Sequence, residues 1–158
     1  MNHEPESRPA NQTQSKTATS YASRRPCVLL VEDDRSVRRY LEVTLQRSGY
    51  QPISARDGLE AMKLALSSEI DAVVTDAIMP HLSGQQLAGF LRSYPRFSHV
   101  PIILLTGQED EGAVASADDP IDAFLHKPVK AEELTGCLAS LLQKMQENQE
   151  GSRSNKST

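Results

Sequence analysis

The chain has 158 residues and a formal net charge of −4, from 17 basic and 21 acidic side chains. This length favours a single domain, and the acidic balance argues against a nucleic-acid-binding protein, which usually carries a basic surplus. Its apolar runs are far shorter than the roughly 20 residues of a membrane-spanning helix. Because the two cysteines fit no disulfide framework or zinc pattern, we expect a cytoplasmic protein without membrane contact.

The two ends of the chain differ in composition from its middle. Residues 1–25 contain five apolar side chains and residues 146–158 contain none. Such segments cannot bury enough surface to offset the entropy lost on ordering. The sequence therefore predicts a disordered N-terminal tail at 1–25, one compact domain at 26–145 and a disordered C-terminal tail at 146–158.

In the first half of the domain, strands and helices alternate. Cys27–Val31 is an unbroken apolar run, typical of a strand buried on both faces. Helical spacing follows at Val37, Leu41 and Leu45, and Gly49 fits the end of that helix. Residues 51–55 predict an edge strand, because Pro52 cannot donate a ladder hydrogen bond.

The second half repeats the alternation. Asp57 and Ser83 are suited to cap two helices, and Asp34 to begin an earlier one. Strands are predicted at 72–74, 102–105 and 123–125, a marginal helix at 113–115 and a strong last helix over 134–145. Acidic residues at 109–122 indicate a solvated surface. Five strand–helix units predict an α/β fold, with helices on both faces of a parallel sheet.

Polar side chains follow four of the predicted strands: Glu32 and Asp33, then Asp76, Thr106 and Lys127. In an open α/β sheet, ligands bind beyond the carboxyl ends of the strands, so these groups should share one edge. Clustered carboxylates repel one another unless a cation neutralises them, and oxygen ligands suit Mg²⁺. An aspartate, Mg²⁺ and a lysine together indicate a phosphoryl-transfer site.

The sequence resembles the receiver domain of two-component response regulators over about residues 26–145. The resemblance rests on four motifs in order: Val28–Asp34, Asp71–Pro80 with Gly84 following, Pro101–Gly107 and Phe124–Pro128. It implies a flavodoxin-like (βα)5 sheet with strand order 2-1-3-4-5. It also implies an aspartate that accepts a phosphoryl group from a histidine kinase or a histidine phosphotransfer protein.

The resemblance assigns the acidic positions. Asp76 matches the phosphoacceptor, Asp33 a direct Mg²⁺ ligand and Glu32 an acid that reaches the metal through water. Asp76 is also implied as a ligand, and Ile78 is implied to offer its backbone carbonyl to the metal. The side chains of Ile78 and Gln108 match positions that tune dephosphorylation.

The resemblance also assigns a switch. Thr106 matches the hydroxyl that moves onto the phosphoryl group, and Lys127 the lysine that pairs with a phosphoryl oxygen. Phe124 matches the aromatic side chain that swings inward when Thr106 moves. Pro128 is implied to follow a cis peptide bond.

The sequence thus predicts a stand-alone signalling receiver, with no output domain, that changes its protein-binding surface on phosphorylation. It would be no enzyme beyond its own phosphorylation and slow autodephosphorylation. We expect an unidentified downstream protein partner and a monomer or weak phosphorylation-dependent dimer. Two alternatives stay open: a phosphorylation-independent binding module, and a Mg²⁺-dependent phosphatase with an aspartate nucleophile. The second is disfavoured because Ile78 stands where such enzymes carry a second aspartate.

Overall fold

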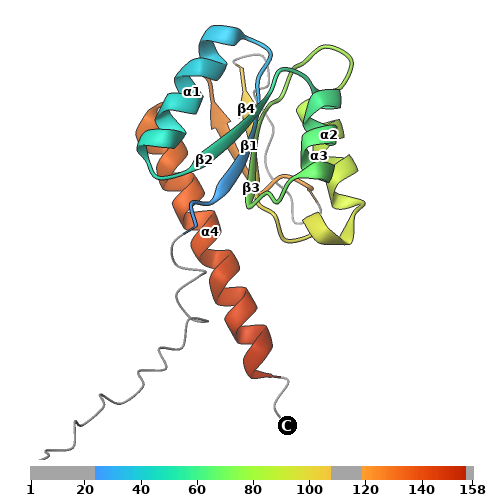
Figure 1. The fold of residues 1–158 in the computed structure, drawn as a ribbon, viewed down its shortest axis with the longest axis vertical. Helices are drawn as coiled ribbons and strands as arrows, with labels where there is room; N and C mark the ends of the chain where they lie inside the picture. Colours follow the sequence, from blue (N-terminus) through green and yellow to red (C-terminus); the bar gives the residue numbers. More distant parts are fainter. Residues whose placement is uncertain (1–23, 108–118, 156–158) are drawn as a thin grey trace, which may run out of the picture.

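The computed structural model describes residues 24–107 and 119–155. These residues form one parallel sheet of five strands in the order β2-β1-β3-β4-β5 (Figure 1). The strands are β1 (Cys27–Val31), β2 (Gln51–Ala55), β3 (Ala72–Asp76), β4 (Ile102–Thr106) and β5 (Ala123–His126). The predicted fold class and strand order are confirmed.

The burial of each strand follows its sequence. β1, β3 and β4 are apolar for most of their length and buried at every position, as expected for strands covered on both faces. β2 lies at one edge of the sheet, where Pro52 pairs with Val28 of β1. β5 forms the other edge and is only half-buried or exposed. The prediction of an edge strand at 51–55 is therefore confirmed.

The described helices are α1 (Arg35–Arg47), α2 (Gly58–Ser67), α3 (Gly84–Arg92), the 3₁₀ turn η1 (Pro95–Phe97) and α4 (Ala131–Ser154). Asp34 and Asp57 cap α1 and α2, and Ser83 forms a capping box with Gln86 at the start of α3. Each cap satisfies a backbone N–H that the first helical turn leaves without a partner. The predicted helix at 113–115 and most of the acidic segment lie outside the described residues.

Helices cover both faces of the sheet (Figure 1). α1 and α4 pack on one face, where Leu41 and Leu45 of α1 share a buried cluster with Leu134 and Leu138 of α4. α2, α3 and η1 pack on the other face around a second cluster that includes Leu87. The sheet is thereby buried on both sides, while the carboxyl ends of its strands meet at one edge.

The ordered chain extends further at both ends than the sequence predicted. α4 continues to Ser154 rather than ending at Met145, so the prediction of a disordered tail is wrong for 146–154. Residues 146–155 are exposed. Once a helix has started, each further residue adds a hydrogen bond that roughly offsets the entropy lost on fixing that residue, so a helix can continue without burial. At the other end, Arg24 pairs with Glu69 at 2.9 Å. The 26–145 limits of the compact domain stay a prediction.

The longest described helix is α4, with 24 residues. Neither it nor any other helix within 24–107 and 119–155 is long and apolar enough to cross a bilayer.

Arg92 of α3 fixes the amino ends of β4 and β5. Its guanidinium donates to the carbonyl oxygens of Phe97 and Val100, each at 2.7 Å, and to the carboxylate of Asp122 at 2.8 Å. The same carboxylate oxygen accepts from the backbone N–H of Ile102 at 2.7 Å. One side chain thus joins a helix to the segments that enter both strands, at the edge of the sheet opposite the predicted site.

Candidate functional site

The carboxyl ends of four strands deliver the predicted polar groups to one edge of the sheet. Glu32 follows β1, Asp76 ends β3, Thr106 ends β4 and Lys127 follows β5. These strands are neighbours in the sheet, so residues far apart in the sequence meet there. Asp33 follows Glu32 and lies in the same cluster, so all five polar residues expected at the strand ends lie at this edge of the sheet.

Three carboxylates form the centre of this site. One oxygen each from Glu32, Asp33 and Asp76 lies within 4.8 Å of the others. Glu32 and Asp76 are buried, whereas Asp33 is exposed. Three negative charges this close repel one another, and a set of oxygen donors alone fits a hard divalent cation such as Mg²⁺. The donor set therefore suits the ion that the sequence predicted.

Lys127 joins two of these carboxylates. Its Nζ lies 2.9 Å from Oε2 of Glu32 and 3.0 Å from Oδ2 of Asp76. Burial alone would lower the pKa of Lys127, but its hydrogen bonds with both carboxylates outweigh this effect and raise it. The ammonium therefore stays charged and neutralises part of the acidic cluster. The peptide bond between Lys127 and Pro128 is cis, as the resemblance implied.

The carboxyl group of Glu32 has a raised pKa. Burial raises its pKa from 4.5 to about 7; the charge of Asp76 adds to the rise and the bond from Lys127 opposes it. Its second oxygen accepts a hydrogen bond from the backbone N–H of Asp34 at 3.2 Å. Both carboxylate oxygens of Glu32 thus have protein partners, which limits its direct access to a metal ion.

The sequence did not single out Arg38 of α1. Its guanidinium donates to the backbone carbonyl of Glu32 at 2.8 Å and lies 3.4 Å from that of Asp33. It therefore holds the loop that carries both acids. Arg35 and Arg39 lie on the same helix, and no pattern in the sequence distinguishes Arg38 from them.

The hydroxyl of Thr106 is turned toward β5. Thr106 is 1% exposed, and its Oγ1 lies 3.2 Å from Nδ1 of His126 and 3.4 Å from the carbonyl oxygen of Leu125. Phe124, two residues before His126, is partly buried against the cluster shared with α2 and α3. The proposed switch residues Thr106 and Phe124 thus lie on adjacent strands.

Ile78 lies beside Asp76 with its side chain 61% exposed. Its backbone N–H points toward Oδ1 of Asp76, with 3.4 Å between nitrogen and oxygen. Gln108, the second position predicted to tune dephosphorylation, lies outside the described residues.

Gly84, the first residue of α3, allows a close approach to Asp76. A Cβ at this position would lie 2.3 Å from the backbone carbonyl oxygen of Asp76 and 2.5 Å from Leu104. The backbone N–H of Gly84 donates to the carbonyl of Ala77 at 3.0 Å. The missing side chain therefore lets α3 pack directly on the backbone that carries the central acid.

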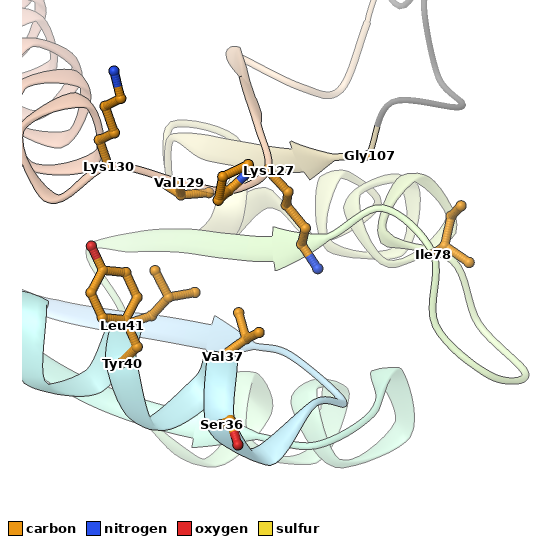
Figure 2. Close-up of a pocket in the computed structure, with 10 residues that line it drawn as sticks. Ser36, Val37, Tyr40, Leu41, Ile78, Gly107, Lys127, Val129 and Lys130 are labelled. Atoms are coloured by element: carbon orange, nitrogen blue, oxygen red, sulfur yellow. The ribbon is translucent and has the colours of Figure 1, made fainter.

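An apolar groove of about 1030 Å³ opens next to Lys127. Figure 2 shows Val37 and Tyr40 of α1 on one side and Val129 on the other, with the Lys127 ammonium beside the end of β3. The helical spacing predicts Val37 on the apolar face of α1, whereas no pattern in the sequence distinguishes Tyr40. Nearly half of the Tyr40 side chain is exposed, so the groove presents apolar surface to solvent.

Comparison with known proteins identifies the family. Residues 28–139 match the model of the response regulator receiver domain. Because this match covers more than half of the chain, the chain belongs to the receiver domain family, the signalling domains of two-component systems. The resemblance stated from the four sequence motifs is confirmed.

Individual relatives agree with this assignment. The chain is 38% identical to the response regulator MprA of Mycobacterium sp. (strain KMS) over 118 residues, 74% of this chain and 50% of that protein. It is 32% identical to hybrid signal transduction histidine kinase D of Dictyostelium discoideum over 75% of this chain and 8% of that protein. The chain thus spans about half the length of the response regulators it matches.

Solved structures match the fold. The signal receiver domain of an HD domain-containing protein from Pseudomonas fluorescens Pf-5 gives a TM-score of 0.71 at 30% identity, covering 78% of this chain and 99% of that one. A putative response regulator from Chloroflexus aurantiacus J-10-fl gives the same TM-score and identity, covering 76% and 99%.

Proposed function

We propose that Asp76 accepts a phosphoryl group from a phosphohistidine and that this modification switches the protein-binding surface of the domain. One observation carries the proposal: Lys127 contacts Glu32 and Asp76 at about 3 Å, inside a cluster of three carboxylates. A carboxylate nucleophile with an adjacent ammonium and a cation-binding oxygen set is what phosphoryl transfer to an aspartate requires.

In the proposed reaction, an oxygen of the Asp76 carboxylate forms a bond to phosphorus. The phosphorus–nitrogen bond to the donor imidazole breaks, and its electron pair stays on that nitrogen. Lys127, already 3.0 Å from Asp76, neutralises charge on an oxygen of the transferred group. Asp33, Asp76 and the backbone carbonyl of Ile78 would hold Mg²⁺, with Glu32 reaching it through water. The ion supplies further charge neutralisation.

The groove beside Lys127 supports a protein phosphodonor. It is lined by apolar side chains such as Val37 and Tyr40, and it borders the ammonium that contacts Asp76. A helical partner that fills this groove would bring its histidine next to the acceptor. Contiguous exposed apolar surface beside a charged centre is typical of a protein-docking site.

Acetyl phosphate with and without Mg²⁺ tests the acceptor directly, with intact mass as the readout. We expect one added phosphoryl group in the wild type with Mg²⁺, none with EDTA, and none in Asp76→Asn. Asp57→Asn makes the same chemical change at the cap of α2 and should leave labelling intact. Full labelling of Asp76→Asn would refute the assignment. No labelling of the wild type by any donor would favour the phosphorylation-independent binding module instead.

A further inference from the structure

The hydroxyl of Thr106 is held by the strand next to it. Thr106 and His126 are partners in the β4–β5 ladder, and the backbone N–H of Lys127 donates to the carbonyl of Thr106 at 2.7 Å. This register places the Thr106 Oγ1 3.2 Å from Nδ1 of His126 and 3.4 Å from the carbonyl oxygen of Leu125. Within the described residues, both polar contacts of this hydroxyl therefore go to β5 and neither goes to the acidic cluster.

Either tautomer of His126 satisfies the Thr106 hydroxyl. If Nδ1 carries a proton, it donates to Oγ1, and Thr106 donates to the carbonyl of Leu125. If Nδ1 is unprotonated, Thr106 donates to it instead. Thr106 is 1% exposed, so water has little access to its hydroxyl, although the His126 side chain itself is exposed. A move of the hydroxyl toward Asp76 must therefore break the bond to His126.

Of the two contacts, the one with His126 is the stronger. A distance of 3.4 Å to Leu125 lies beyond the usual 2.5–3.0 Å range of an O–H···O bond. The backbone carbonyl of Leu125 is present whatever side chain follows it. Of the two contacts, only the one with residue 126 therefore depends on a side chain and can be removed by substitution.

We propose that His126 is a positioning residue that holds the Thr106 hydroxyl in its resting place and so limits how readily the phosphorylated state forms. This inference rests on the proposed function, in which Thr106 turns to an oxygen of the phosphoryl group on Asp76. Removing the imidazole removes a bond that exists in the resting state alone. The activated state should then form about 3- to 10-fold more readily, the effect of losing one ordinary hydrogen bond.

Beryllium fluoride, a stable mimic of a phosphoryl group on a carboxylate, tests this by calorimetric titration with Mg²⁺ present. We expect His126→Val to bind it about 3- to 10-fold more tightly than wild type. His126→Asn places an amide close to the Nδ1 position and should stay within about twofold of wild type. His99→Val, an exposed histidine away from the site, is the matched control and should not change the affinity.

A double-mutant cycle separates this role from a general effect on the strand. With Thr106→Val already present, the hydroxyl is gone and His126→Val should produce no further change. The inference is overturned if His126→Val alone binds beryllium fluoride no more tightly than the wild type does. It is also overturned if His126→Val raises the affinity equally when Thr106→Val is present. If the wild type itself neither binds beryllium fluoride nor accepts phosphate, the proposed function fails and this inference fails with it.

Discussion

Replacing Lys127 with methionine removes the cation that joins two buried carboxylates. The Glu32 and Asp76 side chains are 1% and 9% exposed, and the Lys127 side chain is 27% exposed. Removing one partner of a buried ion pair costs about 3–5 kcal/mol of unfolding free energy, because the remaining charge is left uncompensated. The partial exposure of Lys127 places the expected loss near the low end, about 3 kcal/mol at pH 8 without metal.

The loss should depend on pH through Glu32. Its pKa is about 7 in the folded wild type and near 4.5 when unfolded. The folded state thus retains a proton over this range, and stability falls by up to about 1.4 kcal/mol per pH unit as pH rises to 7, then levels off. Without Lys127 the pKa of Glu32 rises further, so the stability of the variant continues to fall above pH 7. The gap between variant and wild type should widen by up to about 1 kcal/mol from pH 7 to pH 8, because the wild-type Glu32 is still half-protonated at pH 7.

Urea unfolding in EDTA at pH 6 and pH 8 measures both effects. Lys130→Met, three residues further on and exposed, is the control and should change stability little at either pH. We expect a modest loss for Lys127→Met at pH 6 and the larger loss at pH 8. Equal losses at the two pH values, or a loss no greater than that of Lys130→Met, would refute the argument that Lys127 compensates a buried glutamate.

Three further predictions concern neighbouring residues. Asp33→Asn should weaken Mg²⁺ binding in calorimetric titration more than Glu32→Gln does, because Lys127 already neutralises Glu32; equal losses would contradict this ranking. Ile78→Asn should speed loss of the phosphoryl group by about tenfold or more, because an amide can orient the attacking water and isoleucine cannot; slower decay of label would count against it. Gly84→Ala should cost about 1–3 kcal/mol in urea unfolding by overpacking against the Asp76 backbone. In contrast, Gly89→Ala in the same helix meets nothing within 4 Å and should stabilise by up to about 1 kcal/mol; similar effects at both glycines would show that the close approach is unimportant.

The sequence predicted the sheet well because its signals there are local. An unbroken run such as Cys27–Val31 has few alternatives to a buried parallel strand. Asp57 and Ser83 cap their helices as expected. The prediction ended the last helix too early, at Met145 rather than Ser154. A lack of apolar residues indicates a lack of burial, but an established helix can continue without burial.

The residues of the site were predictable as a group, since strand ends at one edge must meet. The contacts between individual side chains of the site were not predictable. Glu32 was expected to reach a metal through water, and no pattern in the sequence indicates that Lys127 contacts one of its oxygens. His126 and Arg38 contact Thr106 and the Glu32 backbone through side-chain orientation and strand register, which no spacing rule specifies. The groove likewise depends on how far α1 stands from Val129.

α4 extends from the site to a point well beyond the sheet. The helix starts at Ala131, four residues after Lys127, and its 24 residues at about 1.5 Å each make a rod of about 36 Å. In Figure 1 its far half extends beyond the sheet, and residues 146–155 are exposed. For a rod of this length, a tilt of about 5° at the base displaces the tip by about 3 Å. A small angular change at the Lys127 end of a straight helix of this length would therefore appear as a several-fold larger displacement at Ser154 than near Ala131.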